Sequence, residues 1–205
     1  MNDYLIYSIG LIAQIFFSIR LLVQWISSEK EKKVVAPTLF WSLSLIASFL
    51  LFIYGYFRND FAIMLGQFIT YYIYIRNLQL QHQWKKLPKG IRIFFIYFPI
   101  SVLLFTFLKG EYDITQLFKK DYISSWLLVL GIVSQLVFTF RFIYQWVLSV
   151  RIKTSELPSG FWIISLLGAM LILIYAIFRK DPILFIGQVF GLVIYIRNLM
   201  ILKRQ

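Results

Sequence analysis

One pattern of polar and aromatic residues occurs twice in this chain of 205 residues, and it constrains the fold more than any other feature. Each residue of the first copy recurs 121 positions later, so that Gln14 matches Gln135 and Asn77 matches Asn198 without an insertion or deletion. A constant spacing across a mostly apolar sequence indicates an internal duplication. The first copy consists of Gln14, Arg20, Gln24, Trp25, Pro37, Phe40, Trp41, Ser44, Tyr54, Asp60, Gly66, Gln67, Tyr74, Arg76, Asn77 and Leu78.

The composition indicates that both copies lie in a membrane. Hydrophobic residues make up 60% of the chain and charged residues only 15%, whereas soluble domains carry roughly 25% charged residues. The length suits about seven membrane-spanning helices of roughly 20 residues each. The first apolar segment follows no basic region and is too long for a cleaved signal peptide, so we expect it to be a retained helix.

The residue inventory argues against several kinds of site. There is no cysteine, which excludes disulfides, thiol catalysis and thiolate metal sites. The one histidine, His82, lies in a polar linker, which argues against a histidine metal site or a Ser-His-Asp triad. We therefore predict no metal, no cofactor and no catalytic residue. The net charge of +12 is attributed to basic loops at anionic lipid headgroups, and no nucleic-acid partner is expected.

The predicted fold is an all-α integral membrane protein with seven transmembrane helices. Three-helix repeats at 1–80 and 122–205 flank a linker at 81–121, which contains a fourth helix at about 91–108. Because a three-helix unit crosses the membrane an odd number of times, the fourth crossing gives both repeats the same orientation. The helices of the repeats are predicted at about 4–26, 37–57 and 61–80, and at about 123–148, 158–178 and 183–202.

The distribution of lysine and arginine sets the predicted orientation. The loops on one side of the membrane, together with the C-terminus, carry thirteen of these residues, and the loops on the other side carry six. The positive-inside rule places the richer side in the cytoplasm. We therefore predict a multi-pass protein with its N-terminus outside and its C-terminus in the cytoplasm.

Two arginines lie inside predicted membrane helices at equivalent positions. Arg20 and Arg141 are each about five residues before the inner end of their helix, which is roughly 8 Å at 1.5 Å per residue. One interpretation is snorkelling to the inner headgroups. The other is that they face the bundle and bind an anionic group, because an intramembrane cation is costly without a partner. Gln24 and Gln145 follow four residues later on the same helix face, and an arginine beside an amide suits phosphate or carboxylate oxygens.

Other polar residues of the pattern also lie inside predicted helices. Two glutamines are about ten residues inside their helices and so near the midplane of the membrane. Two more precede a tyrosine by seven residues and therefore share a helix face with it. These side chains either form hydrogen bonds between helices or line a cavity for a polar substrate. The candidates are Gln14, Gln135, Gln67, Gln188, Tyr74 and Tyr195.

The ends of the helices supply four further candidates. Trp41 and Trp162 follow the start of their helices by one turn. An aromatic belt at the membrane surface explains them, and stacking on a sugar ring is the alternative. Asn77 and Asn198 lie near the ends of their helices on the predicted cytoplasmic side. Aspartate, serine or lysine would be solvated equally well there, so solvation alone does not explain the choice of asparagine.

Two other recurring pairs have structural interpretations. Asp60 and Asp181 precede helices and are predicted to cap them. Gly66 and Gly187 are predicted to allow a close approach between helices. No acidic residue lies in the middle of a predicted helix, which argues against a buried carboxylate pair for hydrolysis.

The motifs resemble those of a known membrane domain. Both repeats contain Q-x5-R-x3-Q-W-x2-S, P-x2-F-W-x2-S and G-Q-x6-Y-x-R-N-L. This set is similar to that of the lipid A biosynthesis N-terminal domain, which itself resembles the PQ-loop and SWEET families. The resemblance implies two three-helix bundles around a central path, transport of sugars, amino acids or lipid-linked sugars, and a place in the bacterial inner membrane. The PQ dipeptide of those families is Ala13-Gln14 and Ser134-Gln135 here, so a proline hinge is not carried over.

Three functional hypotheses follow. The first is a transporter or flippase for an anionic lipid-linked sugar or lipid A-type glycolipid, in which Arg20 and Arg141 hold the phosphate and Gln24 and Gln145 assist. The second is a non-catalytic membrane subunit that docks or presents lipid to a glycosyltransferase, since the domain's name comes from fusions to lipid-A-disaccharide synthase. The third is an enzyme in its own right, but no nucleotide-sugar loop is visible in these residues. An oligomer is compatible with all three.

Overall fold

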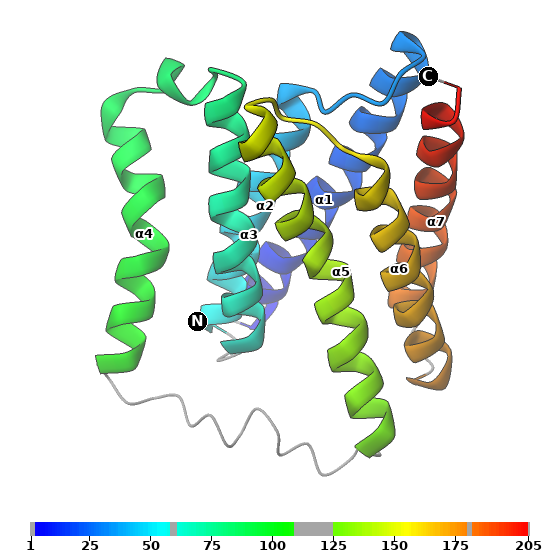
Figure 1. The fold of residues 1–205 in the computed structure, drawn as a ribbon. Coiled ribbons are helices and arrows are strands. Elements are labelled where there is room, and N and C mark those ends of the chain that lie inside the picture. Colours follow the sequence, from blue (N-terminus) through cyan, green and yellow to red (C-terminus); the bar gives the residue numbers. More distant parts are fainter. Residues whose placement is uncertain (1–2, 58–60, 109–124, 180–181, 205) are drawn as a thin grey trace. The chain divides into compact units, whose positions relative to one another are not determined.

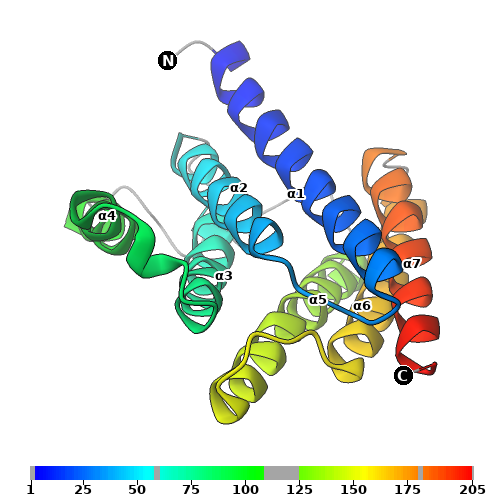
Figure 2. The same cartoon turned by 90° about the horizontal axis from the view of Figure 1, so that it is seen from above.

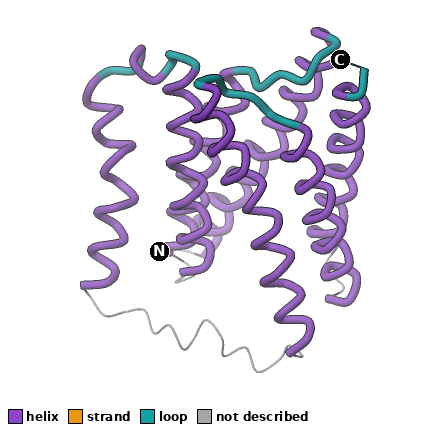
Figure 3. The backbone as a smooth tube through the Cα atoms, in the orientation of Figure 1, coloured by secondary structure: helices purple, strands orange, loops and turns teal. Residues whose placement is uncertain are grey.

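The computed structural model describes residues 3–57, 61–108, 125–179 and 182–204. These residues form seven α-helices and one short 3-10 helix, and they contain no β-strand (Figures 1 and 3). The all-α prediction is therefore confirmed. The elements are α1 (Asp3–Glu31), α2 (Thr38–Phe57), α3 (Phe61–Leu80), η1 (Trp84–Lys86), α4 (Lys89–Leu108), α5 (Ser125–Ile152), α6 (Ser159–Arg179) and α7 (Pro182–Leu202).

Several helices have the length and composition of membrane spans. In the described part of the chain, four segments are apolar over enough residues to cross a bilayer, and they belong to α1, α2, α5 and α6. This supports a membrane protein. A full set of seven crossings remains a prediction. The four segments are Tyr4–Glu31, Thr38–Phe57, Val129–Ile152 and Ser159–Phe178.

The first helix of each repeat is longer than predicted. The predicted ends lie near residues 26 and 148, whereas α1 continues to Glu31 and α5 to Ile152. The extension of α1 contains glutamate and lysine, which are good helix formers. Lys32 and Lys153 then adopt φ values of 52° and 57°, the left-handed conformation that commonly ends a helix. The two predicted aspartate caps lie outside the described residues.

The chain packs into two compact units. Unit 1 comprises Met1–Arg20 and Thr38–Asp121, and unit 2 comprises Leu21–Pro37 and Tyr122–Gln205. In unit 1, α2 packs against α3, and in unit 2, α6 packs against both α5 and α7 (Figure 2). The C-terminal part of α1, from Leu21 onward, belongs to unit 2, so polar residues from the first repeat take part in contacts with α7.

A close contact between the first and second helices recurs in both units. A Cβ atom added to Gly10 would lie 2.9 Å from the ring of Tyr54. The same distance separates a Cβ at Gly131 from the ring of Tyr175. Because glycine lets a neighbouring side chain lie directly on the helix backbone, these pairs explain why both tyrosines recur in the repeat pattern.

Helix α4 has no counterpart in the second repeat and is attached to unit 1 by aromatic and polar contacts. The ring centre of Phe98 lies 4.9 Å from that of Phe49 on α2. Pro99 lacks a backbone N–H, so a carbonyl in the preceding turn loses its helical partner. That carbonyl belongs to Phe95, and the Tyr72 hydroxyl donates to the next one along, that of Ile96, at 2.7 Å. Such bonds stabilise a helix that proline interrupts in an apolar environment.

Candidate functional site

Arg20 is buried inside unit 1, with 5% of its surface exposed. Its Nη1 donates to Ser44 Oγ at 2.9 Å and to Tyr74 Oη at 3.0 Å. Its Cζ lies 4.5 Å from the ring centre of Phe17 and 5.4 Å from that of Phe40. The faces of these rings attract a cation. The hydroxyl groups are neutral, so they hold the guanidinium without cancelling its charge. We call these residues, together with the adjacent Trp41, the Arg20 cage.

Arg141 occupies the equivalent place in unit 2 and is 3% exposed. Its Nη1 donates to Tyr195 Oη at 3.0 Å, and its Cζ lies 3.5 Å from the ring centre of Phe138 and 4.8 Å from that of Phe142. These residues, together with Trp162, form the Arg141 cage. Each arginine is eleven residues from the C-terminal end of its helix, roughly 16 Å. Both face the interior of their unit, so the snorkelling interpretation is wrong.

Trp41 and Trp162 complete the two cages. Both side chains are fully buried, and their ring centres lie 6.1 Å and 6.0 Å from those of Tyr74 and Tyr195. The indole N–H of each is buried and has no acceptor among the residues that the structure describes. A buried donor without an acceptor costs about 1–3 kcal/mol, and here the cost recurs in both units. The tryptophans therefore do not belong to an aromatic belt, because they lie in the interior.

Gln24 and Gln145 hold the loops that follow their helices. The Nε2 of Gln24 donates to Ser28 Oγ at 2.9 Å and to the carbonyl of Val35 at 3.3 Å. Ser28 Oγ also accepts from the backbone N–H of Val35 at 3.1 Å. Both glutamines are fully buried, so they act as positioning residues in this structure. In the second repeat, Gln145 Nε2 donates to Ser149 Oγ at 2.8 Å and to the carbonyl of Glu156 at 3.0 Å.

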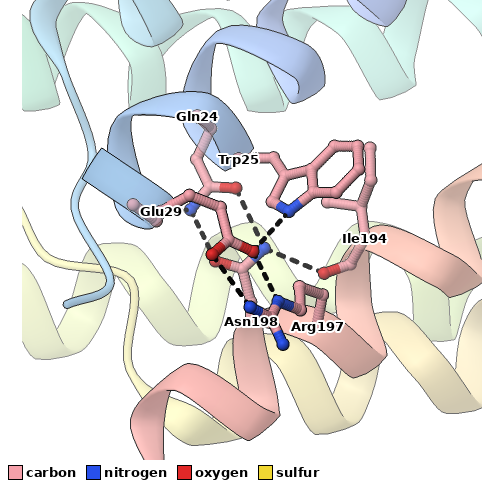
Figure 4. A network of polar contacts seen from close by, with 7 residues as sticks. Gln24, Trp25, Glu29, Ile194, Arg197 and Asn198 are labelled. Atoms are coloured by element: carbon pink, nitrogen blue, oxygen red, sulfur yellow. Dashed lines mark hydrogen bonds and ion pairs between the residues drawn. The ribbon is translucent and has the colours of Figure 1, made fainter. Parts of the chain in front are cut away.

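Asn198 on α7 binds the C-terminal part of α1 within unit 2 (Figure 4). Gln24 Nε2 donates to Asn198 Oδ1 at 2.7 Å, and Asn198 Nδ2 donates to Gln24 Oε1 at 3.1 Å and to the carbonyl of Ile194 at 2.9 Å. This exchange needs a donor and an acceptor on one short side chain, which an amide provides. Asn77 is also fully buried and donates to the carbonyl of Ile73 at 2.9 Å. The choice of asparagine is thereby explained.

An ion pair lies beside this amide pair, and Figure 4 shows both. Arg197 binds the Glu29 carboxylate through Nε and, at 2.9 Å, through Nη2. Trp25 Nε1 donates to the same carboxylate at 2.9 Å. Val150 stands at the position equivalent to Glu29, and Arg76 at the position equivalent to Arg197. Because valine has no carboxylate, the ion pair cannot recur between the equivalent residues. Glu29 is not among the sequence-predicted candidates, because only residues that recur were considered. The sequence signal for Glu29 is a charged residue whose equivalent in the second repeat is uncharged.

The other four predicted glutamines differ in burial from Gln24 and Gln145. Gln14 and Gln135 are exposed, and Gln67 and Gln188 are half-buried. In the described ranges, no hydrogen bond joins any of these four side chains to the arginine of a cage. Their proposed contact with a substrate therefore remains a prediction.

Both repeats match the family model of the Lipid A Biosynthesis N-terminal domain, at residues 9–79 and 130–200. The chain is 31% identical over 210 residues to a lipid-A-disaccharide synthase of Chlamydia pneumoniae. It is 29% identical to the synthase of Chlamydia felis and 27% identical to that of Chlamydia trachomatis. These alignments cover 98% of this chain but 34% of each relative, so the chain spans about a third of their length. No solved structure matches the chain.

Proposed function

This chain belongs to the family of the Lipid A Biosynthesis N-terminal domain, and we propose that it moves an anionic lipid-linked sugar or a lipid A-type glycolipid across the bacterial inner membrane. In this proposal all seven helices cross the membrane, with the N-terminus outside. The phosphate of the lipid binds Arg20 and Arg141, and the acyl or prenyl tail stays in the bilayer. The path of the headgroup is lined by Gln14, Gln135, Gln67 and Gln188.

The observation that carries the proposal is the burial of Arg20 and Arg141 at equivalent positions. A charged side chain inside a membrane is costly, and such residues commonly mark a path for substrate or ions. Hydroxyl groups and aromatic rings fix both guanidinium groups in place. A fixed guanidinium offers parallel N–H donors that match the spacing of phosphate oxygens. An anionic headgroup is therefore the substrate chemistry that suits these sites.

The tryptophans add a second donor to each site. The indole N–H groups of Trp41 and Trp162 are buried without an acceptor in the described residues, and a phosphate or sugar oxygen would satisfy them. Because both cages are closed to the outside in this structure, the headgroup reaches them only after the surrounding helices separate. Such an opening is the movement that transport requires.

A flipping assay tests the proposal. The purified chain is placed in vesicles that contain a trace of a fluorescent polyprenyl-phosphate sugar, and the accessible label is quenched from outside with dithionite. Arg20→Ala and Arg141→Ala should each slow flipping about tenfold or more, since charged hydrogen bonds contribute about 1.5–3 kcal/mol. Arg→Lys should keep part of the activity.

The control is Arg151→Ala, which removes an exposed arginine from the same helix as Arg141. This variant should flip lipid at the wild-type rate. All variants are first compared by gel filtration and circular dichroism to confirm that they fold. Wild-type flipping in both cage variants, Arg20→Ala and Arg141→Ala, would rule out the proposed role of the arginines.

The alignments with lipid-A-disaccharide synthases favour a second candidate function. In it, the chain docks or presents lipid to a glycosyltransferase without moving the lipid, and the buried arginines stabilise the helices. It predicts that the chain co-purifies with a transferase when both are expressed together. It also predicts that vesicles with the chain alone show no flipping above protein-free vesicles.

A further inference from the structure

Unit 1 contains a pocket between α2 and α4 that does not include the arginine cage. Its volume is about 510 Å³, within the range of roughly 300–1,000 Å³ that small-molecule sites occupy. Its walls are the segments of α2 between Phe52 and Phe57 and of α4 between Phe98 and Phe105. We infer that this pocket binds one acyl chain of a membrane lipid.

The walls of the pocket are almost entirely hydrocarbon and aromatic. Tyr56 and Ser101 are the two residues with a polar side-chain group among those that line it, and none carries a charge. Ser101 Oγ donates to the carbonyl of Phe98 at 2.9 Å, so this hydroxyl is bonded within its own helix. A lipid headgroup would leave its polar atoms unpaired here, at a cost of several kcal/mol. The occupant is therefore the apolar part of a lipid.

The rim of the pocket is apolar as well. Of the lining residues, Phe57 is 40% exposed and Phe105 is 49% exposed. One wall belongs to α2, which is long and apolar enough to cross a membrane. A chain that enters sideways from the bilayer thus remains among apolar groups throughout, which favours a lipid over a soluble ligand.

The shape of the pocket suits a thin, flexible occupant. Its walls are parts of two neighbouring helices, and a helix is roughly 10 Å across with its side chains. An acyl chain is much thinner and fits along the two walls.

The pocket lies next to a cluster of rings that joins α4 to α2. Phe94, Phe95 and Phe98, which precede Pro99, all have ring contacts with Phe49 of α2. The pocket residues of α4 run from Phe98 onward. The pocket therefore begins at the end of this cluster and continues past the proline. Since α4 has no counterpart in the second repeat, the site occurs once.

Photolabelling tests the inference independently of transport. The full chain in detergent is photolysed with increasing amounts of a fatty acid that carries a diazirine in the middle of its chain. Labelled peptides are then located by mass spectrometry. We expect saturable labelling of the segments Phe52–Phe57 and Phe98–Phe105 that an excess of unlabelled fatty acid removes. Detergent replaces loosely bound chains, so other exposed apolar faces should be labelled weakly and without saturation.

Variants with a filled pocket provide the matched comparison. Val102→Trp places a ring in the pocket, and each methylene that it displaces weakens binding about fourfold. Saturable labelling should fall by more than about tenfold, while Leu104→Trp, at a position 58% exposed on the same helix, should leave it unchanged. If Val102→Trp does not fold, Ser101→Leu serves as the smaller substitution.

The same assay separates this inference from the proposed function. Arg20→Ala should leave the labelling unchanged whether or not it abolishes flipping, because Arg20 does not line the pocket. Uniform, non-saturable labelling overturns the acyl-chain assignment, as does equal labelling of Val102→Trp and the wild type. A benzophenone side chain at position 102 that cross-links mainly to a second copy of the chain also overturns it, because a protein would then occupy the pocket.

Discussion

The Arg20 and Arg141 cages contain the same signature residues but hold their arginines differently. Arg20 donates to two hydroxyl groups, those of Ser44 and Tyr74. Arg141 donates to the hydroxyl of Tyr195. Its Cζ lies 3.5 Å from the nearest ring centre, that of Phe138, whereas the Cζ of Arg20 lies 4.5 Å from the ring centre of Phe17. Ser165, the equivalent of Ser44, binds only the carbonyl of Phe161 among the described residues. Among these contacts, the guanidinium of Arg20 meets two hydroxyl groups, whereas that of Arg141 lies closer to its nearest ring.

One sequence difference accompanies this shift. Phe142 lies 4.8 Å from the guanidinium carbon of Arg141, and the residue at the equivalent position of the first repeat is Leu21. A cation–π contact contributes about 0.5–2 kcal/mol, which is comparable to a hydrogen bond from a charged donor at about 1.5–3 kcal/mol. An additional ring can therefore replace a hydroxyl contact. We therefore expect the two arginines to respond differently to substitution of their neighbours.

The largest expected effect tests where the cages should agree. Trp41→Ala and Trp162→Ala each remove a fully buried ring and should lower the free energy of unfolding by about 3–5 kcal/mol. Unfolding is followed by circular dichroism during denaturant titration in detergent. Trp→Phe variants, which keep most of the ring, should lose much less and serve as controls. A loss at one tryptophan that is several times the loss at the other would show that the cages also differ in packing.

An effect of intermediate size should come from the serine of each cage, because among the described residues Ser44 accepts a hydrogen bond from its arginine and Ser165 does not. Ser44→Ala removes an acceptor from a charged donor and should lower the free energy of unfolding by about 1–2 kcal/mol. Ser165→Ala removes a bond to a carbonyl in its own helix and should cost about 0.5 kcal/mol or less. The same denaturant titration measures both. Equal losses would contradict the distinction between the two cages.

A double-mutant cycle sharpens the assigned cause. If the Phe142 ring keeps Arg141 away from Ser165, Phe142→Leu should allow the arginine to reach that hydroxyl. Ser165→Ala should then cost more in the Phe142→Leu background than in the wild type, by about 1 kcal/mol. A coupling energy of zero would assign the difference between the cages to something other than this ring.

The sequence predicts the helices well because a membrane limits the choice of structure. Segment 61–80 was predicted to be helical, and α3 spans Phe61–Leu80. The sequence places the ends of α1 and α5 too early, near residues 26 and 148, whereas the helices continue to Glu31 and Ile152. The close approach predicted at Gly66 and Gly187 is wrong, since an added Cβ there would contact nothing within 4 Å.

The polar contacts were less predictable than the helices. Repeat spacing identifies Arg20 and Gln24, but it does not say which groups they bind. The bond between Gln24 and Asn198 joins residues 174 positions apart, and only the three-dimensional packing of unit 2 brings them together. Helical periodicity reports which face of a helix is apolar. It contains no information on the partner that a buried amide meets.

The smallest expected effect concerns the ion pair that breaks the repeat. Glu29→Gln removes the charge that Arg197 binds, and both side chains are about one third exposed. Exposed pairs contribute little, so the loss of stability should be smaller than for Ser44→Ala. It should disappear near 1 M salt, where the Debye length is about 3 Å. Glu31→Gln is the matched control, because the Glu31–Lys33 pair is more exposed and should contribute even less. A loss for Glu29→Gln that salt does not reduce would contradict this charge-based account, because the amide oxygen of glutamine can still accept from Trp25 Nε1.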